Sequence, residues 1–181
     1  MKKTAVIYSS KYGHTKKYAE WIAQDLSADI FDLKSFDKKL LSNYETLVFG
    51  SGLYAGRIAF ADILAKNIEQ IKDKKIVLFT VGTGDVSNEK NTDYVKKQFF
   101  AKFPEEFMKN TKLFCLRGGV DYENLSFIHR KMMDMVHFVL SKKKPEELKF
   151  EDKEFLDVFG KKVDFTDKNS ILPLVTFAKE N

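Results

Sequence analysis

The chain alternates between two kinds of apolar pattern. Short runs rich in Val, Ile, Leu and Phe recur along it, and turn-forming residues separate them from the segments between. Runs that are continuously apolar are typical of strands buried on both faces of a parallel sheet. Five such runs lie at residues 4–9, 29–33, 45–51, 75–81 and 112–117.

The segments between these runs carry apolar residues at helical spacing instead. Apolar positions three and four residues apart mark the face of a helix that packs on a sheet. Strands that alternate with such helices are typical of an α/β protein, so we predict a doubly wound five-stranded parallel sheet with right-handed connections and helices on both faces. The helical positions are Tyr18, Ile22, Ala23 and Leu26, then Ile58, Ala61, Leu64, Ala65 and Ile68, then Tyr94, Phe99, Phe100 and Phe103.

The length and composition favour a single domain. A chain of 181 residues with 44% hydrophobic residues can bury one substantial core. Residues 1–141 contain all the predicted strands. Residues 142–181 are heavily charged with scattered aromatics. We expect them to form an extension that is packed on, or appended to, the same domain.

A further apolar stripe at helical spacing follows the fifth run. We expect it to be the face by which a last helix packs on the sheet. Additional apolar residues widen the surface beyond this stripe, and Lys142 to Lys144 follow at once, which favours a second interpretation: contact with a membrane surface or a partner. The stripe consists of Ile128, Met132, Met135, Val136 and Val139, and the added residues are Met133, His137, Phe138 and Leu140.

Charge and patterning restrict the partners. The formal net charge of +5 favours phosphates, carboxylates or an anionic membrane surface. We expect no nucleic-acid partner. The chain has neither a long uncharged apolar run nor a signal-like start. The expected location is the cytoplasm, with a peripheral position at the inner face of the membrane as the alternative.

The sequence offers no metal site or recognisable catalytic constellation. Its one cysteine, Cys115, lies inside an apolar run and is expected to be a buried structural thiol. His129 and His137 are eight residues apart, which is not the spacing of a helical zinc pair. No Ser-His-Asp or Cys-His arrangement is supported, so no residue is assigned as catalytic.

The stretch after the first run has the composition of a phosphate-binding loop. Ser10 and Thr15 supply hydroxyl donors, and Gly13 permits close approach and unusual torsions. The helix that begins near Thr15 adds free amides and the positive end of its dipole. The alternative is that Ser10 and Thr15 only cap the helix while Gly13 turns the chain.

Two more runs end in glycine-rich segments, at residues 50–57 and 81–91. The carboxyl ends of parallel strands share one edge, where open α/β sheets bind ligands. Three loops of small residues at this edge therefore favour a ligand site over a mere turn. The Gly-x-Gly-x-x-x-Gly spacing from Gly50 is a weak match to the nicotinamide fingerprint and follows the third run rather than the first.

The segments VIYSSKYGHT, FGSGLYAGR and TVGTGD resemble the FMN-binding loops of flavodoxins over roughly residues 2–140. The resemblance implies a sheet order of 2-1-3-4-5 and FMN as cofactor. The first loop would hold the phosphate, with His14 as a further donor, and the other two would flank the isoalloxazine ring, with Tyr54 against its face. The implied cofactor-binding residues are Ser10, Lys11, Tyr12, Gly13, His14, Thr15, Ser51, Gly52, Leu53, Tyr54, Ala55, Gly56, Thr83, Gly84 and Asp85.

Within that group, the basic, methionine-rich segment after the fifth run resembles the quinone-dependent protoporphyrinogen IX dehydrogenases. This implies an FMN oxidoreductase of heme biosynthesis that acts on an anionic tetrapyrrole and reduces a quinone, with Arg57, Arg117 and Arg130 as candidates to hold substrate carboxylates. Two alternatives stay open: an electron carrier without its own substrate, and a flavodoxin-fold binding protein without cofactor. Carriers of this family are acidic around the flavin, whereas this chain has a pI near 9.0.

Overall fold

The computed structural model describes residues 3–54, 57–101 and 103–180. Its main sheet has the strand order β2-β1-β3-β5-β6, with all neighbours along this path parallel and the short β4 paired antiparallel to β3. The predicted doubly wound sheet of order 2-1-3-4-5 is thus confirmed. The strands are β1 (Thr4–Ser9), β2 (Asp29–Asp32), β3 (Thr46–Tyr54), β4 (Arg57–Ile58), β5 (Lys75–Gly82) and β6 (Thr111–Arg117).

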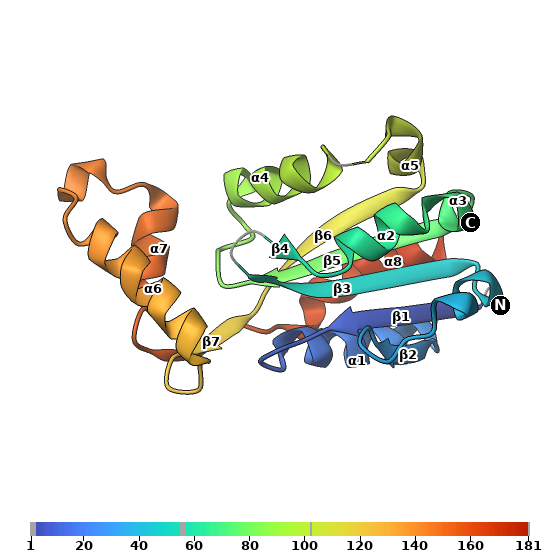
Figure 1. Ribbon diagram of the computed structural model, residues 1–181, viewed down its shortest axis with the longest axis horizontal. Coiled ribbons are helices and arrows are strands. Elements are labelled where there is room, and N and C mark those ends of the chain that lie inside the picture. The colour runs from blue at the N-terminus through green and yellow to red at the C-terminus, as the bar shows by residue number, and fades with distance from the viewer. Residues whose placement is uncertain (1–2, 55–56, 102, 181) are drawn as a thin grey trace.

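Helices cover both faces of this sheet (Figure 1). One face carries the first helix and the last, and the other carries those that follow β3 and β5. The first group is α1 (His14–Leu26) and α8 (Leu172–Lys179), and the second is α2 (Ala61–Lys66), α3 (Ile68–Ile71), α4 (Glu89–Phe100) and α5 (Glu105–Lys109). Three 3-10 turns lie at Lys38–Asn43, Pro145–Glu147 and Lys168–Ile171.

The central strands β1, β3 and β5 are mostly apolar because successive side chains enter different cores. Ile7 and Leu78 belong to the cluster under α2–α5, whereas Val6 and Val77 belong to the cluster under α1 and α8. All four are fully buried. Successive side chains of a strand point to opposite faces of the sheet, and helices cover both faces. Apolar residues therefore occupy consecutive positions in these runs and do not alternate with polar ones.

The second predicted helix is shorter than its apolar spacing indicates. Ile58 lies in β4, opposite Leu53 of β3. The helix begins only at Ala61, and it is interrupted at Asn67, whose side chain donates to the Ile63 carbonyl at 2.8 Å. A side-chain amide that bonds the backbone in this way competes with the helical hydrogen bonds and marks the break.

An excursion leaves the sheet after β6. It runs from β7 (Gly119–Asp121) to β8 (Lys162–Asp164), which pair antiparallel, and contains α6 (Phe127–Leu140) and α7 (Phe150–Val158). In Figure 1 these two helices stand beyond the edge of the sheet. We call residues 119–164 the excursion.

The expectation that residues 127–140 pack on the sheet is wrong. Only Leu140 of α6 is buried, and the helix lies against α7. The place on the sheet belongs to α8, through Leu174, Val175 and Ala178. An apolar stripe shows that a helix has a packing face but not which surface receives it. The domain boundary drawn at residue 141 stays a prediction.

One buried hydroxyl joins the two ends of the excursion. Tyr18 of α1 is fully buried and donates to the Arg117 carbonyl, at the end of β6, at 2.7 Å. The same oxygen accepts from the Asp167 amide, just after β8, at 3.1 Å. The points where the chain leaves the sheet and returns to it are therefore both fixed to α1.

Tyr18→Phe is expected to lower the free energy of unfolding by about 1–3 kcal/mol, because it leaves two buried backbone groups without their partner. Urea denaturation measures this, and hydrogen exchange at the Asp167 amide should become faster. Tyr94→Phe, at a residue that is 67% exposed, is the control. Equal losses in both variants would contradict this role of Tyr18.

Candidate functional site

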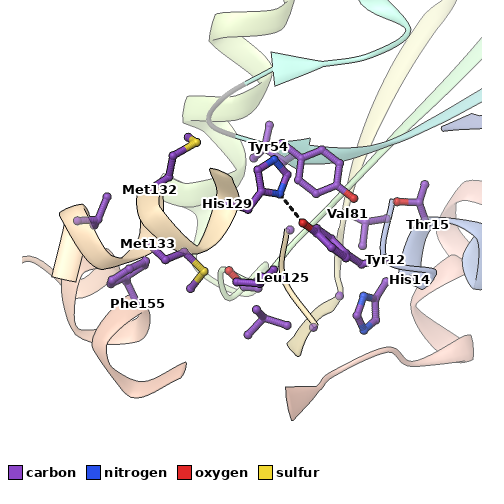
Figure 2. A pocket seen from close by; sticks show the side chains of 17 residues that line it. Tyr12, His14, Thr15, Tyr54, Val81, Leu125, His129, Met132, Met133 and Phe155 are labelled. Carbon is purple, nitrogen blue, oxygen red and sulfur yellow. Dashed lines mark hydrogen bonds between the residues drawn. The ribbon is translucent and has the colours of Figure 1, made fainter. Parts of the chain in front are cut away.

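The candidate site lies where the carboxyl ends of the sheet strands meet the excursion. A cavity of about 360 Å³ separates this edge from α6. In Figure 2 the side chains of α6 and α7 face those of the first loop and of β3 and β5 across it. The lining residues are Tyr12, His14, Thr15, Leu53, Tyr54, Val81, Gly82, Thr83, Gly118, Gly119, Val120, Leu125, His129, Met132, Met133, Val136 and Phe155.

The loop between β1 and α1 presents hydrogen-bond donors. Gly13 has φ of 95°, a left-handed conformation that favours glycine, and its amide donates to Ser10 Oγ at 3.1 Å. The first intrahelical bond runs from the Lys17 amide to the Gly13 carbonyl. The amides of residues 14–16 therefore have no intrahelical acceptor, which is the arrangement that binds anions.

The donor set of this loop fits a phosphate. Thr15 is only 2% exposed, and it lines the cavity. Among the described residues, its hydroxyl has no hydrogen-bond partner. Amides, hydroxyls and the Lys11 ammonium are all donors, and the Asp164 carboxylate lies 3.9 Å from His14 Nε2. Such a set suits an anion rather than a cation.

The ring of Tyr54 is folded back along β3. A Cβ on Gly52 would lie 2.6 Å from this ring, so only glycine allows the approach. The Tyr54 hydroxyl accepts from the Lys11 amide at 3.4 Å, and burial raises the pKa of Tyr54. A ligand oxygen that bound the Lys11 amide would have to displace this hydroxyl.

Helix α6 closes over the first loop. His129 Nδ1 and the Tyr12 hydroxyl are hydrogen-bonded at 2.7 Å, and the His129 ring stacks on that of Tyr54 with centroids 5.4 Å apart. Lys11 Nζ donates to Ser126 Oγ at 3.1 Å. Burial, with the Lys11 charge, lowers the pKa of His129, which favours the neutral ring that these contacts need.

His14 faces the excursion. Its Nε2 lies 3.9 Å from Asp164 Oδ1, and its ring lies so close to β7 that a Cβ on Gly119 would be 2.8 Å from Nε2. Lys17 of α1 reinforces this junction, because its Nζ donates to Asp164 at 3.2 Å and to Thr166 at 2.7 Å. The β7–β8 pair is thus tied to the start of α1.

The third loop is held by a carboxylate from α7. Glu154 Oε1 accepts from the Asp85 amide at 2.8 Å, and Oε2 accepts from Asn91 Nδ2 at 3.1 Å. Arg117 Nη2 lies 3.6 Å from Glu154, and Arg117 Nε donates to the Thr83 carbonyl. The loop that was expected beside the flavin is therefore fixed from the excursion side.

A second cavity of about 530 Å³ adjoins the first and shares Leu53, Gly82, Thr83 and Phe155 with it. Cys115 lines this second cavity and lies on β6, as the sequence predicts. Burial raises the pKa of its thiol. A protonated, half-buried thiol is a poor nucleophile, in keeping with a structural role.

The predicted site residues are only partly brought to one place. Ser51 is buried, and its Oγ accepts from the Ala59 amide at 3.0 Å, so it holds the backbone just after β4. The Asp85 carboxylate accepts from the Ser87 amide, which lowers its pKa. Tyr12, His14, Thr15, Leu53, Tyr54 and Thr83 line the first cavity, Leu53, Thr83, Gly84 and Asp85 line the second, and Ser10, Lys11, Gly13 and Gly52 lie beside them.

Ala55 and Gly56 fall outside the described residues. Two of the candidate arginines already have partners within the chain. Arg117 is engaged by Glu154 and Thr83, and Arg130 Nη2 donates to the Glu123 carbonyl at 2.5 Å. The backbone of Arg57 in β4 is paired antiparallel with that of Tyr54 in β3.

Sequence reasoning missed the contribution of the excursion to the site. Met133, Val136 and Phe155 form its far wall, His129 contacts Tyr12, and Glu154 holds the third loop. The signal for α6 was present, because apolar residues lie outside its main stripe, but Glu154 is one acid in a tail rich in Lys and Glu. Nothing in its neighbourhood distinguishes it.

Within the described ranges, no group of three or more His, Cys, Asp or Glu side chains is placed to hold a metal ion. In the same part of the chain, every helix is too short or too polar to cross a bilayer.

Residues 5–147 match the model of the flavodoxin domain family. An uncharacterized protein of Methanocaldococcus jannaschii is 31% identical over 84 residues, which are 43% of this chain and 53% of that protein. The chain thus spans about half the length of this curated relative.

Solved structures resemble the chain more distantly. A flavodoxin from the domain Archaea is 11% identical with a TM-score of 0.45, and the match covers 98% of this chain and 99% of that one. Flavodoxin 2 of Bacillus cereus is 22% identical (TM-score 0.44, coverage 64% and 82%). An FMN complex of a flavoprotein from Lactobacillus acidophilus is 18% identical (TM-score 0.43, coverage 65% and 93%).

The family match covers most of the chain and includes β1, β3 and β5 with the loops after them. The chain belongs to the flavodoxin domain family, and its cofactor is FMN. The donors around Gly13 fit the phosphate of that cofactor.

The Asp164 carboxylate predicts an acid-dependent loss of stability. Burial alone would raise its pKa, but hydrogen bonds from Thr166 and Lys17 outweigh burial and lower the pKa from 3.8 to about 2. A pKa lowered by folding stabilises the fold above 3.8, and this contribution is lost as the pH falls towards about 2. Asp164→Asn should therefore weaken the pH dependence of unfolding in this window, whereas Asp157→Asn, at an exposed position on α7, should leave it unchanged.

Glu154→Ala should loosen the third loop, because it removes an acceptor from the Asp85 amide and from Asn91. Losing such charged hydrogen bonds costs about 1.5–3 kcal/mol, so hydrogen exchange at the Asp85 amide should become roughly tenfold faster or more. Glu151→Ala, at an exposed position one turn earlier on α7, is the matched control. Unchanged exchange in the Glu154 variant would show that α7 does not hold the loop.

Proposed function

We propose that the protein is an FMN-dependent oxidoreductase with a small-molecule substrate of its own. The observation that carries the proposal is the apolar wall that α6 and α7 place opposite the flavin loops, formed by Met132, Met133, Val136 and Phe155. A carrier that only passes electrons between proteins needs an accessible flavin edge and no such wall. A cavity between the loops and the wall is suited to holding a substrate against the cofactor.

The residues of the chain have separate tasks in this proposal. FMN, when bound, supplies the two-electron chemistry. The amides of residues 14–16 and the hydroxyls of Ser10 and Thr15 hold its phosphate. Tyr54 gives an aromatic surface for the ring, and Glu154 keeps the third loop in position. The apolar wall excludes water from the space where hydrogen transfer would occur.

The chemistry of the cavity supports a flat, largely apolar ligand as substrate or acceptor. A quinone has this character, and one of its carbonyls would find a donor in the Tyr54 hydroxyl, which the chain uses only as an acceptor. In the finer form of the proposal, protoporphyrinogen IX is the hydrogen donor and a quinone is the acceptor. The net charge of +5 favours a substrate that bears carboxylates.

Removal of the Thr15 hydroxyl should weaken FMN binding. Thr15→Val keeps the side-chain shape but deletes one donor to a charged group, which corresponds to a loss of roughly 10-fold to 100-fold in affinity. Titration with quenching of flavin fluorescence measures the dissociation constant. Thr176→Val, at an exposed threonine of α8, should bind FMN like the unchanged chain. Equal affinity in both variants would mean that Thr15 does not contact the phosphate.

An anaerobic assay separates the enzyme from a carrier. The FMN-loaded protein is mixed with protoporphyrinogen IX and menaquinone, and the formation of porphyrin and of menaquinol is followed together. Coupled formation of both, slowed by Met133→Glu in the cavity wall, is the expected result. FMN reduction by a partner flavoprotein without any porphyrinogen oxidation would favour the carrier.

A further inference from the structure

The large apolar side chains that remain exposed are concentrated on the excursion. Elsewhere among the described residues they are scattered, at Ile30 on β2, Tyr94 on α4 and Leu172 on α8. Scattered apolar residues are normal on a protein surface, whereas a contiguous group marks an interaction site. The group on the excursion consists of Phe127, Ile128, Met132, Met135, Val136, Phe138, Val139 and Phe150.

Helix α6 has two apolar sides with different surroundings. His129 and Met133 lie on the side that faces the cavity. Ile128, Met135 and Val139 repeat at helical spacing on the outward side, and they are 69%, 64% and 54% exposed. A helix that is apolar all round is normally buried. No described residue covers Ile128, Met135 and Val139, so this apolar side of α6 is open to a partner surface.

The cations around this outward side identify the kind of surface. Lys142 Nζ lies 3.8 Å from the centroid of the Phe138 ring, and Lys131 Nζ lies 5.8 Å from that of Phe127. Both ammonium groups thus lie by aromatic rings in cation–π contacts, and both lysines are exposed, so positive charge borders the apolar side of α6. Lys144 extends the basic border.

Carboxylates are few beside these lysines. Asp134 is the one acidic residue of α6, and it is engaged by the Tyr122 hydroxyl and lies 3.8 Å from Lys131 Nζ. Glu146 and Glu147 follow in the next turn, and the Glu147 carboxylate accepts from the Lys144 amide. The outward side of α6 is therefore apolar with a positive border.

We propose that the outward face of α6 lies on the surface of an anionic lipid bilayer. Apolar side chains would enter the boundary between head groups and acyl chains, and Lys131 and Lys142 would meet lipid phosphates. A helix of 14 residues is about 21 Å long, shorter than the roughly 30 Å hydrocarbon core, so it lies along the surface.

A second copy of the chain fits this face less well. A symmetric pair would place the same surface on both partners and so bring the lysine borders together, which is unfavourable. An anionic bilayer would bury the apolar face of α6 and would also pair its lysines with lipid phosphates. Because the other side of α6 lines the cavity, a lipid-soluble ligand could enter from the membrane. The lipid contact itself does not depend on the proposed reaction.

Co-sedimentation of the full chain with vesicles tests the proposal. We expect binding to vesicles of phosphatidylcholine with phosphatidylglycerol, and much weaker binding to phosphatidylcholine alone. The double variant Met135→Ser/Val139→Ser removes two inserted side chains and should reduce the affinity at least tenfold. Tyr94→Ser, at an exposed aromatic on α4, should bind like the unchanged chain.

The charge contribution has its own pair of variants. Lys142→Gln should weaken binding to anionic vesicles about fivefold, because one surface lysine contributes about 1 kcal/mol. Lys66→Gln on α2 is the control. Added salt should weaken the binding of the unchanged chain and of Lys66→Gln.

Three results would overturn the proposal. The first is that the unchanged chain fails to sediment with anionic vesicles at low salt. The second is that the double variant Met135→Ser/Val139→Ser binds these vesicles as tightly as the unchanged chain. Sedimentation velocity could also show a dimer that this double variant converts to a monomer, which would make a second copy the occupant. FMN titration of the same preparations separates this proposal from the proposed function. Vesicle binding without FMN binding would reject only the proposed function. FMN binding without vesicle binding would reject only the lipid contact of α6.

Discussion

The structure depends on the hydrogen bonds of one buried hydroxyl. Tyr18 Oη donates to the Arg117 carbonyl and accepts from the Asp167 amide, so α1 holds both ends of the excursion. Lys17, one residue earlier, adds its bonds to Asp164 and Thr166. The excursion can therefore stand beyond the sheet edge and still keep a fixed position over it.

This fixed position adds a second wall to the site at the sheet edge. The loops after β1, β3 and β5 supply anion donors, an aromatic ring and glycine-rich backbone. The excursion supplies the opposite wall and reaches back to each loop, through His129 to Tyr12 and Tyr54, and through Glu154 to Asp85. The family assignment accounts for the loops and the FMN. The excursion is what distinguishes the proposed enzyme from a simple carrier.

The sequence predicts the sheet well because its physical signals are local. Continuous apolar runs mark strands buried on both faces, and parallel strands bring the loops after them to one edge whatever the details of packing. The phosphate loop is predictable for the same reason, since Ser10, Gly13 and Thr15 lie within six residues of one another. The prediction that Ile58 belongs to a helix is wrong, because the spacing of apolar residues alone cannot distinguish the start of a helix from a short strand such as β4.

The remainder of the site depends on contacts between distant parts of the chain. Glu154 meets Asp85 across 69 positions, and His129 meets Tyr12 across 117. No periodicity specifies such pairs. The stripe on α6 predicted a helix correctly but gave it the wrong neighbour, because α8 occupies the sheet and α6 keeps an apolar side exposed.

The loops at this edge are assigned to FMN, and the visible absorption spectrum of the protein shows whether they hold it. The purified chain is incubated with excess FMN, freed of unbound flavin by gel filtration, and measured. The account predicts flavin bands that elute with the protein. A protein that stays colourless after this treatment would contradict the account, because Ser10, Gly13 and Thr15 would then only turn the chain and cap α1.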